Sequence, residues 1–198
     1  MTITAEQVKQ LRERTGAGMM ECKKALAETQ GDVEQAIDVL RKAGNERMKE
    51  RAGRAASEGL VEAYIHPGNR VGVLVEVNCE TDFVARTPEF AELVRNLAMQ
   101  VAAAGAEYVK REDVPAERVA REREIYAGQV AGQGKPVAIV EKIVEGKLEK
   151  FYSDVCLLEQ PYIRDDKVKV GDLVQQAARN TGENVGVRRF ARFRLGQE

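Results

Sequence analysis

Residues 59–78 read GLVEAYIHPGNRVGVLVEVN, and they carry the clearest indication of the fold in the chain. Two runs, 59–66 and 70–78, flank the turn residues Pro67-Gly68-Asn69, a pattern that predicts a β-hairpin. In the second run, every other residue from Val71 to Val77 is a valine. Because successive side chains of a strand point to opposite faces, we expect one buried face on this hairpin.

A long amphipathic helix is predicted directly after the hairpin. It follows the loop NCETDFVAR, residues 78–86, and it begins with Thr87 as N-cap and Pro88 at the first helical position. Apolar residues then recur at spacings of three and four up to Gly105. They are Phe90, Leu93, Val94, Leu97, Ala98 and Val101.

The rest of the chain predicts two charged helices and a final strand. The helices are expected near 115–131 and 136–151, packed antiparallel. Residues 185–195 alternate between apolar residues and arginines, which predicts a strand. We expect Phe193 and Leu195 to point inward, with the arginines on the solvent face. This order of elements indicates an α+β core domain over 58–198, with a small antiparallel sheet packed against helices.

The first 44 residues predict a three-helix bundle. Glycines end each helix, and Thr4 with Gln7 and Asp32 with Gln35 form capping-box patterns. A bundle of this kind resembles a ubiquitin-associated domain. Residues 41–55 carry six Lys or Arg against two Glu, so we expect a basic, partly helical linker over 45–57.

The composition argues against several classes of function. The 198 residues include 31 basic and 32 acidic side chains, and this balance provides no long-range field for nucleic acid. The first residues lack the features of a signal peptide, and no apolar run is long enough to span a membrane. Cys22, Cys79 and Cys156 are far apart and fit reduced thiols. We therefore expect a cytoplasmic protein with no direct nucleic-acid or membrane partner.

No pattern in the chain predicts catalysis or a cofactor. The segment 16–24, GAGMMECKK, has glycines before a lysine, but it lacks the Gly-Lys-Ser/Thr sequence of a phosphate-binding loop. His66 is the single histidine, which makes a zinc site improbable. Glu76, Glu80 and Asp82 could converge beyond the strand, although solvated carboxylates are the more common case. The chain is expected to be no enzyme and to need neither cofactor nor metal.

Two apolar positions leave the sequence open to different readings. Phe83 follows an acid in a short loop, where it could fold inward or act as a rigid probe for a pocket of another protein. Met19 and Met20 lie about 100° apart on a helix, so both cannot point into a three-helix core. Because Met19 shares a stripe with Cys22 and Leu26, we expect Met20 to be the exposed member.

Four strings in the chain together carry a resemblance to a known family. They are LRERTGAGMMECKKAL at 11–26, EVNCETDFVAR at 76–86, EKIVEGKLEKF at 141–151 and LLEQPYI at 157–163. The first two look like the two signatures of the elongation factor Ts family, in its order and spacing. The similarity covers essentially the whole chain.

This resemblance implies a partner and a site. The partner would be elongation factor Tu, bound in its GDP-loaded and nucleotide-free states, so that GDP leaves and GTP enters. The loop that reaches the partner's magnesium site maps onto Thr81, Asp82, Phe83 and Val84. Further partner contacts would fall on Arg12, Met19, Met20 and His66.

The chain departs from the longer pattern of that family. It contains one hairpin-plus-helix unit, where the longer pattern has two related halves and a protruding helical hairpin. We therefore expect a homodimer, with the sheet as a candidate interface. Two alternatives remain open: a ubiquitin-associated-like module fused to a helical adaptor, and an RNA-binding factor using the basic linker and the strand VRRFARFRL at 187–195.

Overall fold

The computed structural model describes residues 3–131 and 136–197, apart from the side chains of residues 45, 47–49 and 52. The chain divides into two compact units, Met1–Arg54 and Ala55–Glu198, and each is described by itself. The finer division into a bundle, a linker and a core domain stays a prediction.

Three helices form the first unit: α1 (Ala5–Thr15), α2 (Met19–Glu28) and α3 (Val33–Ala52). The Thr4 hydroxyl accepts from the Gln7 N–H while the Gln7 side chain accepts from the Thr4 N–H, which completes the predicted capping box. The interior of the bundle is apolar. Its most deeply buried side chains are Leu11, Cys22, Leu26 and Ala36.

The third helix is longer than the sequence predicted. We expected it to end at Gly44, and this expectation is wrong because α3 continues to Ala52 through most of the basic segment. A glycine inside a helix costs only about 1 kcal/mol relative to alanine. Good helix formers before and after Gly44 offset that cost, so the glycine does not end the helix.

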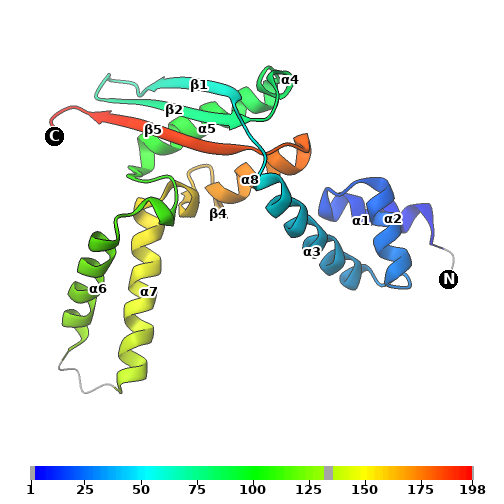
Figure 1. Cartoon of the computed structure of the whole chain (residues 1–198), viewed down its shortest axis with the longest axis horizontal. Helices are drawn as coiled ribbons and strands as arrows, with labels where there is room; N and C mark the ends of the chain where they lie inside the picture. Colours follow the sequence, from blue (N-terminus) through cyan, green and yellow to red (C-terminus); the bar gives the residue numbers. More distant parts are fainter. Residues whose placement is uncertain (1–2, 132–135, 198) are drawn as a thin grey trace. The chain divides into compact units, whose positions relative to one another are not determined.

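The second unit is an α+β fold, as predicted. Its sheet is antiparallel with the order β1 (Glu58–Ile65), β2 (Val71–Cys79), β5 (Gly186–Arg194). Helix α5 (Pro88–Ala104) runs across one face of this sheet (Figure 1). The buried members of the predicted valine stripe pack there against the apolar stripe of α5, and together they form the main core: Val73, Val75, Val77, Phe90, Val94, Leu97 and Val101.

A β-bulge in β5 overturns one expectation. Val77 pairs with Val187, but Glu76 pairs with Arg189, so Arg188 is the extra residue. Because side chains alternate along a strand, one extra residue exchanges the two faces from that point on. Phe193 is consequently 70% exposed, and Leu195, which follows the strand, is 66% exposed, so the prediction that both point inward is wrong.

The bulge also places an arginine under the sheet. After Arg188, the inward positions are Phe190 and Arg192, which pair with the buried Val75 and Val73. The Arg192 guanidinium donates to the Ala102 carbonyl in the last turn of α5, with Nη2 3.5 Å from the oxygen. A cation at the C-terminal end of a helix is favourably placed, because free carbonyl groups gather there.

Two antiparallel helices, α6 (Ala116–Val130) and α7 (Val137–Val155), form a hairpin (Figure 1). Both had been predicted from the sequence within a few residues. At the base of this hairpin, Arg111 donates to the carboxylates of Glu149 and Glu159, with N–O distances of 2.6–3.0 Å. These bonds hold the pKa of both carboxyls below the usual range.

Several elements between α5 and β5 were not predicted from the sequence. They are η1 (Arg111–Asp113), η2 (Leu157–Glu159), β3 (Pro161–Tyr162), β4 (Asp165–Lys169) and α8 (Val170–Thr181). Helix α8 adds Val170, Val174 and Ala178 to the main core. It ends at Gly182, whose φ of 77° lies in the left-handed region that favours glycine.

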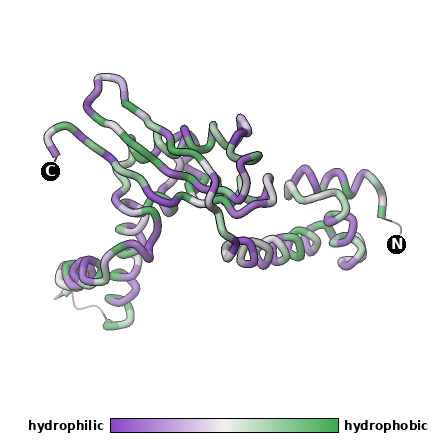
Figure 2. The backbone as a smooth tube through the Cα atoms, turned by 45° about the horizontal axis from the view of Figure 1, so that its top comes forward, coloured by the Kyte–Doolittle hydropathy of each residue, from purple (hydrophilic) through white to green (hydrophobic). Residues whose placement is uncertain are grey.

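No helix within residues 3–131 and 136–197 is both long and apolar enough to span a membrane. Figure 2 shows hydrophilic and hydrophobic segments following one another along the tube.

Candidate functional site

The segment Thr81–Ala85 forms a short helix at the end of β2. Helix α4 (Asp82–Ala85) begins at Thr81, whose hydroxyl accepts from the Val84 N–H at 3.4 Å. Val84 and Ala85 pack on the main core. Two of the four predicted loop residues, Thr81 and Val84, therefore serve to build and anchor the helix, and Asp82 and Phe83 occupy its outer side.

Phe83 points into solvent. Its side chain is 79% exposed, although burying an aromatic ring is one of the more favourable contributions a side chain can make. The structure excludes the reading in which Phe83 folds inward, and the role of Phe83 as a probe for another protein stays a prediction. The core of this region is filled by Val84, Ala85 and Phe90 instead.

Asp82 carries the negative charge next to Phe83. Its carboxylate forms an ion pair with Arg86, one helical turn later, at 2.9 Å. The other acids that were considered with it have separate partners: Glu76 binds Arg189 at 2.7 Å, and Glu80 accepts from the backbone N–H of Asn184. Each of the three carboxylates thus has a partner of its own, and among the described residues none of the three is paired with another of them.

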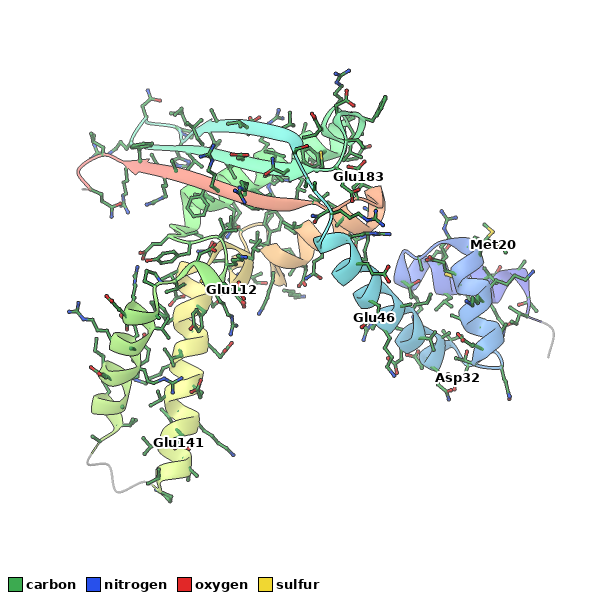
Figure 3. The ribbon with its side chains drawn as sticks, in the orientation of Figure 1. Met20, Asp32, Glu46, Glu112, Glu141 and Glu183 are labelled. Carbon is green, nitrogen blue, oxygen red and sulfur yellow. The ribbon has the colours of Figure 1, made fainter. Side chains whose placement is uncertain are left out.

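Glu183 is a residue of this region that the sequence did not single out. It follows α8, and its carboxylate accepts hydrogen bonds from the backbone N–H groups of Glu80 and Thr81 and from the Thr81 hydroxyl. Figure 3 labels it beside the last turn of α8. Because its partners lie about a hundred residues earlier in the chain, no local pattern could have indicated this role.

The predicted contacts of the first unit lie around the turn between α1 and α2. Arg12 is exposed in the last turn of α1, and Met19 and Met20 open α2. Met20 is 75% exposed, as expected, and its sulfur points outward in Figure 3. Met19 is also 61% exposed, so its assignment to the buried stripe is wrong. The stripe begins only at Cys22, because the first turn of α2 projects beyond the three-helix core.

His66 lies far from Phe83 within the second unit. It occupies the turn between β1 and β2, where its Nδ1 is 3.1 Å from the Tyr64 hydroxyl. Phe83 follows the opposite end of β2, and a strand of this length spans roughly 25–30 Å at about 3.3 Å per residue. The two residues therefore belong to different ends of the sheet and do not form one compact site.

The three cysteines of the chain lie inside the protein. Cys22, Cys79 and Cys156 are buried free thiols. Burial, followed by the nearby Glu183 charge, raises the pKa of Cys79, and burial raises the pKa of Cys156 to about 11. Thiols with raised pKa values are poor nucleophiles at neutral pH. Among the described residues, no three His, Cys, Asp or Glu side chains gather where they could hold a metal ion.

The uncovered side of the sheet forms a second surface, here called the outer face. Pairing places Gly72 opposite Ile65 and Phe193, and Leu74 opposite Ala63 and Ala191. Val61 lies on the same side of β1 as Ala63 and Ile65. The larger apolar residues of this face are solvent-exposed on all three strands: Val61, Ile65, Leu74 and Phe193. A contiguous apolar patch on a sheet is typical of an interaction surface.

Comparisons with known proteins agree with the resemblance seen in the sequence. A family model described as Elongation factor TS matches residues 1–197. The chain is 57% identical to Elongation factor Ts of Carboxydothermus hydrogenoformans, over 98% of this chain and 90% of that protein. It is 59% identical to Elongation factor Ts of Moorella thermoacetica, over 98% and 96%. For Elongation factor Ts of Geobacter sulfurreducens the identity is 54%, over 100% and 91%.

Proposed function

We propose, from the premise that the chain belongs to the elongation factor Ts family, that it is a guanine nucleotide exchange factor for elongation factor Tu. Its place in translation elongation follows from the relatives. In the proposed reaction it binds the GDP-loaded partner in the cytoplasm, promotes release of GDP and leaves the nucleotide-free partner ready for GTP. It performs no bond chemistry of its own.

Binding alone can drive such an exchange. A protein that binds the nucleotide-free form of its partner better than the GDP form must lower the affinity for GDP by the same factor. No catalytic side chain is needed for this, because the free energy comes from the contacts between the two proteins. The buried thiols and the separately paired carboxylates of this chain fit that requirement.

The exposure of Phe83 is the observation that supports the proposal most directly. An aromatic side chain that is exposed on a well-anchored helix provides a large contact area at a low cost in conformational entropy. We propose that Phe83 enters the partner's nucleotide domain between its helices. Asp82 would then disturb the ligands of the magnesium ion, and loss of that cation weakens binding of the diphosphate.

The test is the release of a fluorescent GDP analogue from purified elongation factor Tu, with and without this protein. Acceleration by the intact chain, lost on Phe83→Ala, is the expected result. Val137→Ala is the matched control, since Val137 is an equally accessible apolar residue on the helical hairpin, remote from α4 in the chain. If the intact protein gives no acceleration, the proposal is wrong. Equal loss in both variants would instead exclude a specific role for Phe83.

We also propose contacts with elongation factor Tu through Arg12, Met19, Met20 and His66. The two methionines support this for the first unit, since adjacent exposed thioethers suit an adaptable apolar contact. His66 lies at the other end of the sheet from Phe83, so its contact would involve a different part of the partner. Single alanine variants, measured for binding to nucleotide-free elongation factor Tu, test each contact separately.

We further propose that the chain forms a homodimer through the outer face of the sheet. The face is apolar across all three strands, and two such sheets can stack about 10 Å apart with their side chains interlocked. A second copy of the chain provides a surface of the same chemistry, as an isologous interface requires. The face is bordered by the Glu76–Arg189 ion pair, so a second copy meets both signs of charge there.

Leu74→Glu tests the dimer, with sedimentation equilibrium as the measurement. Leu74 lies in the middle strand, and two-fold symmetry would bring two new carboxylates into the interface. We expect the dissociation constant to rise about a thousandfold or more, since each unpaired buried charge costs several kcal/mol. Val137→Glu should leave the oligomeric state unchanged. A monomeric wild-type protein at micromolar concentration would contradict the proposal.

A further inference from the structure

We infer that Glu183 is a positioning residue for exchange: it fixes the backbone ahead of α4 so that Phe83 is presented in one orientation before the partner arrives. The inference rests on the proposed exchange function and assigns part of it to a residue that does not touch the partner itself. Three observations carry it: the bonds made by the Glu183 carboxylate, the shortness of α4, and a reciprocal bond from Glu80.

The Glu183 carboxylate uses both of its oxygens on the loop. Oε2 accepts from the backbone N–H of Glu80 at 3.0 Å and from that of Thr81 at 3.1 Å. Oε1 accepts from the Thr81 hydroxyl at 2.5 Å. Hydrogen bonds to an ionised acceptor are about twice as strong as those between neutral groups. One side chain thus fixes two consecutive peptide groups and one side chain of the loop.

The Thr81 hydroxyl passes this constraint on to α4. It donates to Glu183 and also accepts from the Val84 N–H at the start of the helix. Helix α4 has only four residues, and a helix of one turn is not stable without outside support. The orientation of Phe83 in that turn therefore depends on its anchors, which include the packing of Val84 and Ala85, the bond from the Thr87 hydroxyl to the Val84 carbonyl, and the bonds to Glu183.

The loop also holds the segment that carries Glu183. The Glu80 carboxylate accepts from the backbone N–H of Asn184 at 2.6 Å, so each segment binds the backbone of the other through a glutamate. The Glu183 N–H donates to the Thr181 hydroxyl at 3.3 Å, next to the left-handed Gly182 that ends α8. The position of Glu183 is therefore set by α8, whose apolar side packs in the main core.

Loss of Glu183 should affect nucleotide exchange in a different way from loss of Phe83. Without Glu183, the loop would sample several conformations, and binding would have to order it. Ordering the backbone of one residue costs roughly 1–2 kcal/mol, which corresponds to about a tenfold loss of affinity. Once bound, however, Phe83 makes its contacts as before. The half-saturating concentration should rise while the maximal exchange rate stays the same.

The experiment compares Glu183→Ala and Glu183→Gln with wild type in the fluorescent GDP release assay. We expect Glu183→Ala to raise the half-saturating concentration about tenfold. Glu183→Gln keeps one carbonyl acceptor and an amide that can bond the Thr81 hydroxyl, so it should recover part of the affinity. Amide hydrogen exchange should accelerate at Glu80 and Thr81 in both variants. Glu141→Ala, an exposed glutamate of α7, is the matched control for removal of a negative charge.

A double variant distinguishes positioning from a general structural role. If Glu183 acts through Phe83, Glu183→Ala should add little to the defect of Phe83→Ala. Fully additive effects, or a lowered maximal rate in Glu183→Gln with unchanged thermal unfolding, would overturn the inference. So would unchanged hydrogen exchange at Glu80 and Thr81. If the wild-type protein did not accelerate GDP release, the proposed function would be rejected instead. Amide hydrogen exchange in the free protein would then still test whether Glu183 orders the loop.

Discussion

Two consecutive helices, α4 and α5, begin in the same way and use their phenylalanines in opposite ways. Each starts at a threonine whose hydroxyl accepts the N–H three residues later: Val84 for Thr81 and Phe90 for Thr87. In both helices that third residue packs on the core. The residue before it faces solvent, and this residue is Glu89 in α5 but Phe83 in α4.

The difference shows what is unusual about Phe83. It occupies a position where the neighbouring helix has a glutamate, and adjacent helical positions differ by about 100° around the axis. Phe83 is therefore not an aromatic residue that failed to reach the core, because the core position in its helix is already filled by Val84. An exposed aromatic side chain in such a place is better explained by an interaction with another molecule than by stability of the fold.

The largest effect is expected for Phe90→Ala. Phe90 is only 2% exposed, and truncation of a buried phenylalanine costs about 3–5 kcal/mol of stability. Chemical denaturation followed by circular dichroism measures this loss. If Phe90→Ala were as stable as wild type, the contrast between the two helices would disappear.

Phe83→Glu should give the opposite result. It places in α4 the residue type that α5 has at the equivalent position, so the free energy of unfolding should change by less than about 0.5 kcal/mol. Exchange on elongation factor Tu should nevertheless fall about thirtyfold or more, as for the loss of a central contact residue. Denaturation and GDP release on the same preparation measure both quantities. A large loss of stability would mark Phe83 as structural.

The two caps offer a finer comparison. Thr87→Ala and Thr81→Ala each remove a hydroxyl that accepts a backbone N–H, and the loss of such a cap costs about 1 kcal/mol. Only Thr81 also donates to Glu183. The Thr87 hydroxyl donates instead to the Val84 carbonyl in α4. Thr81→Ala should therefore weaken nucleotide exchange more than Thr87→Ala does, at a similar cost in stability. Equal exchange by the two variants would show that the cap of α4 has no functional role.

The bonds of Arg111 to two glutamates allow an independent measurement of how much stability a carboxylate contributes when it binds another segment of this protein. The pKa of Glu149 and of Glu159 lies below the value of 4.5 because Arg111 donates to both. A lowered folded-state pKa contributes stability above about pH 4.5, and this contribution is lost as the pH falls through the lowered values. Arg111→Met should cost about 1 kcal/mol at pH 7, since the pair with Glu149 is largely solvent-screened. The difference from wild type should shrink between pH 5 and pH 3. A difference independent of pH would point to lost packing on the Tyr152 ring instead.

The smallest effect is expected for Met19→Ala. Both Met19 and Met20 are exposed, so replacement of either should change the free energy of unfolding by less than about 0.5 kcal/mol. Thermal unfolding of the two variants, with Leu26→Ala as the buried comparison in the same helix, measures this. If Met19→Ala lowered the free energy of unfolding nearly as much as Leu26→Ala, Met19 would have to be part of the core.

Most of the secondary structure of the second unit could be predicted from local patterns. The hairpin, α5 and the two helices of the α6–α7 hairpin follow from turn residues, caps and apolar periodicity, all of which act over a few residues. The end of α3 was predicted wrongly at Gly44. A glycine is recognisable as a helix breaker in the sequence, but the sequence does not show whether the helix propensity of the surrounding residues offsets its cost in free energy. Helix α8 was missed although it carries a regular apolar stripe at Val170, Val174 and Ala178.

The family, the α+β class and the loop on which function is proposed to depend can all be inferred from the amino-acid sequence, because contiguous residues carry them. The three-dimensional structure is needed to see that Phe83 faces solvent, that the bulge at Arg188 turns Phe193 outward, and that Glu183 binds the loop at Thr81. The bulge and the bonds of Glu183 depend on the pairing of segments about a hundred residues apart, and the exposure of Phe83 depends on how α4 packs against β1, β2 and α5. Such pairing is set by the packing of the whole core, and no local pattern records it.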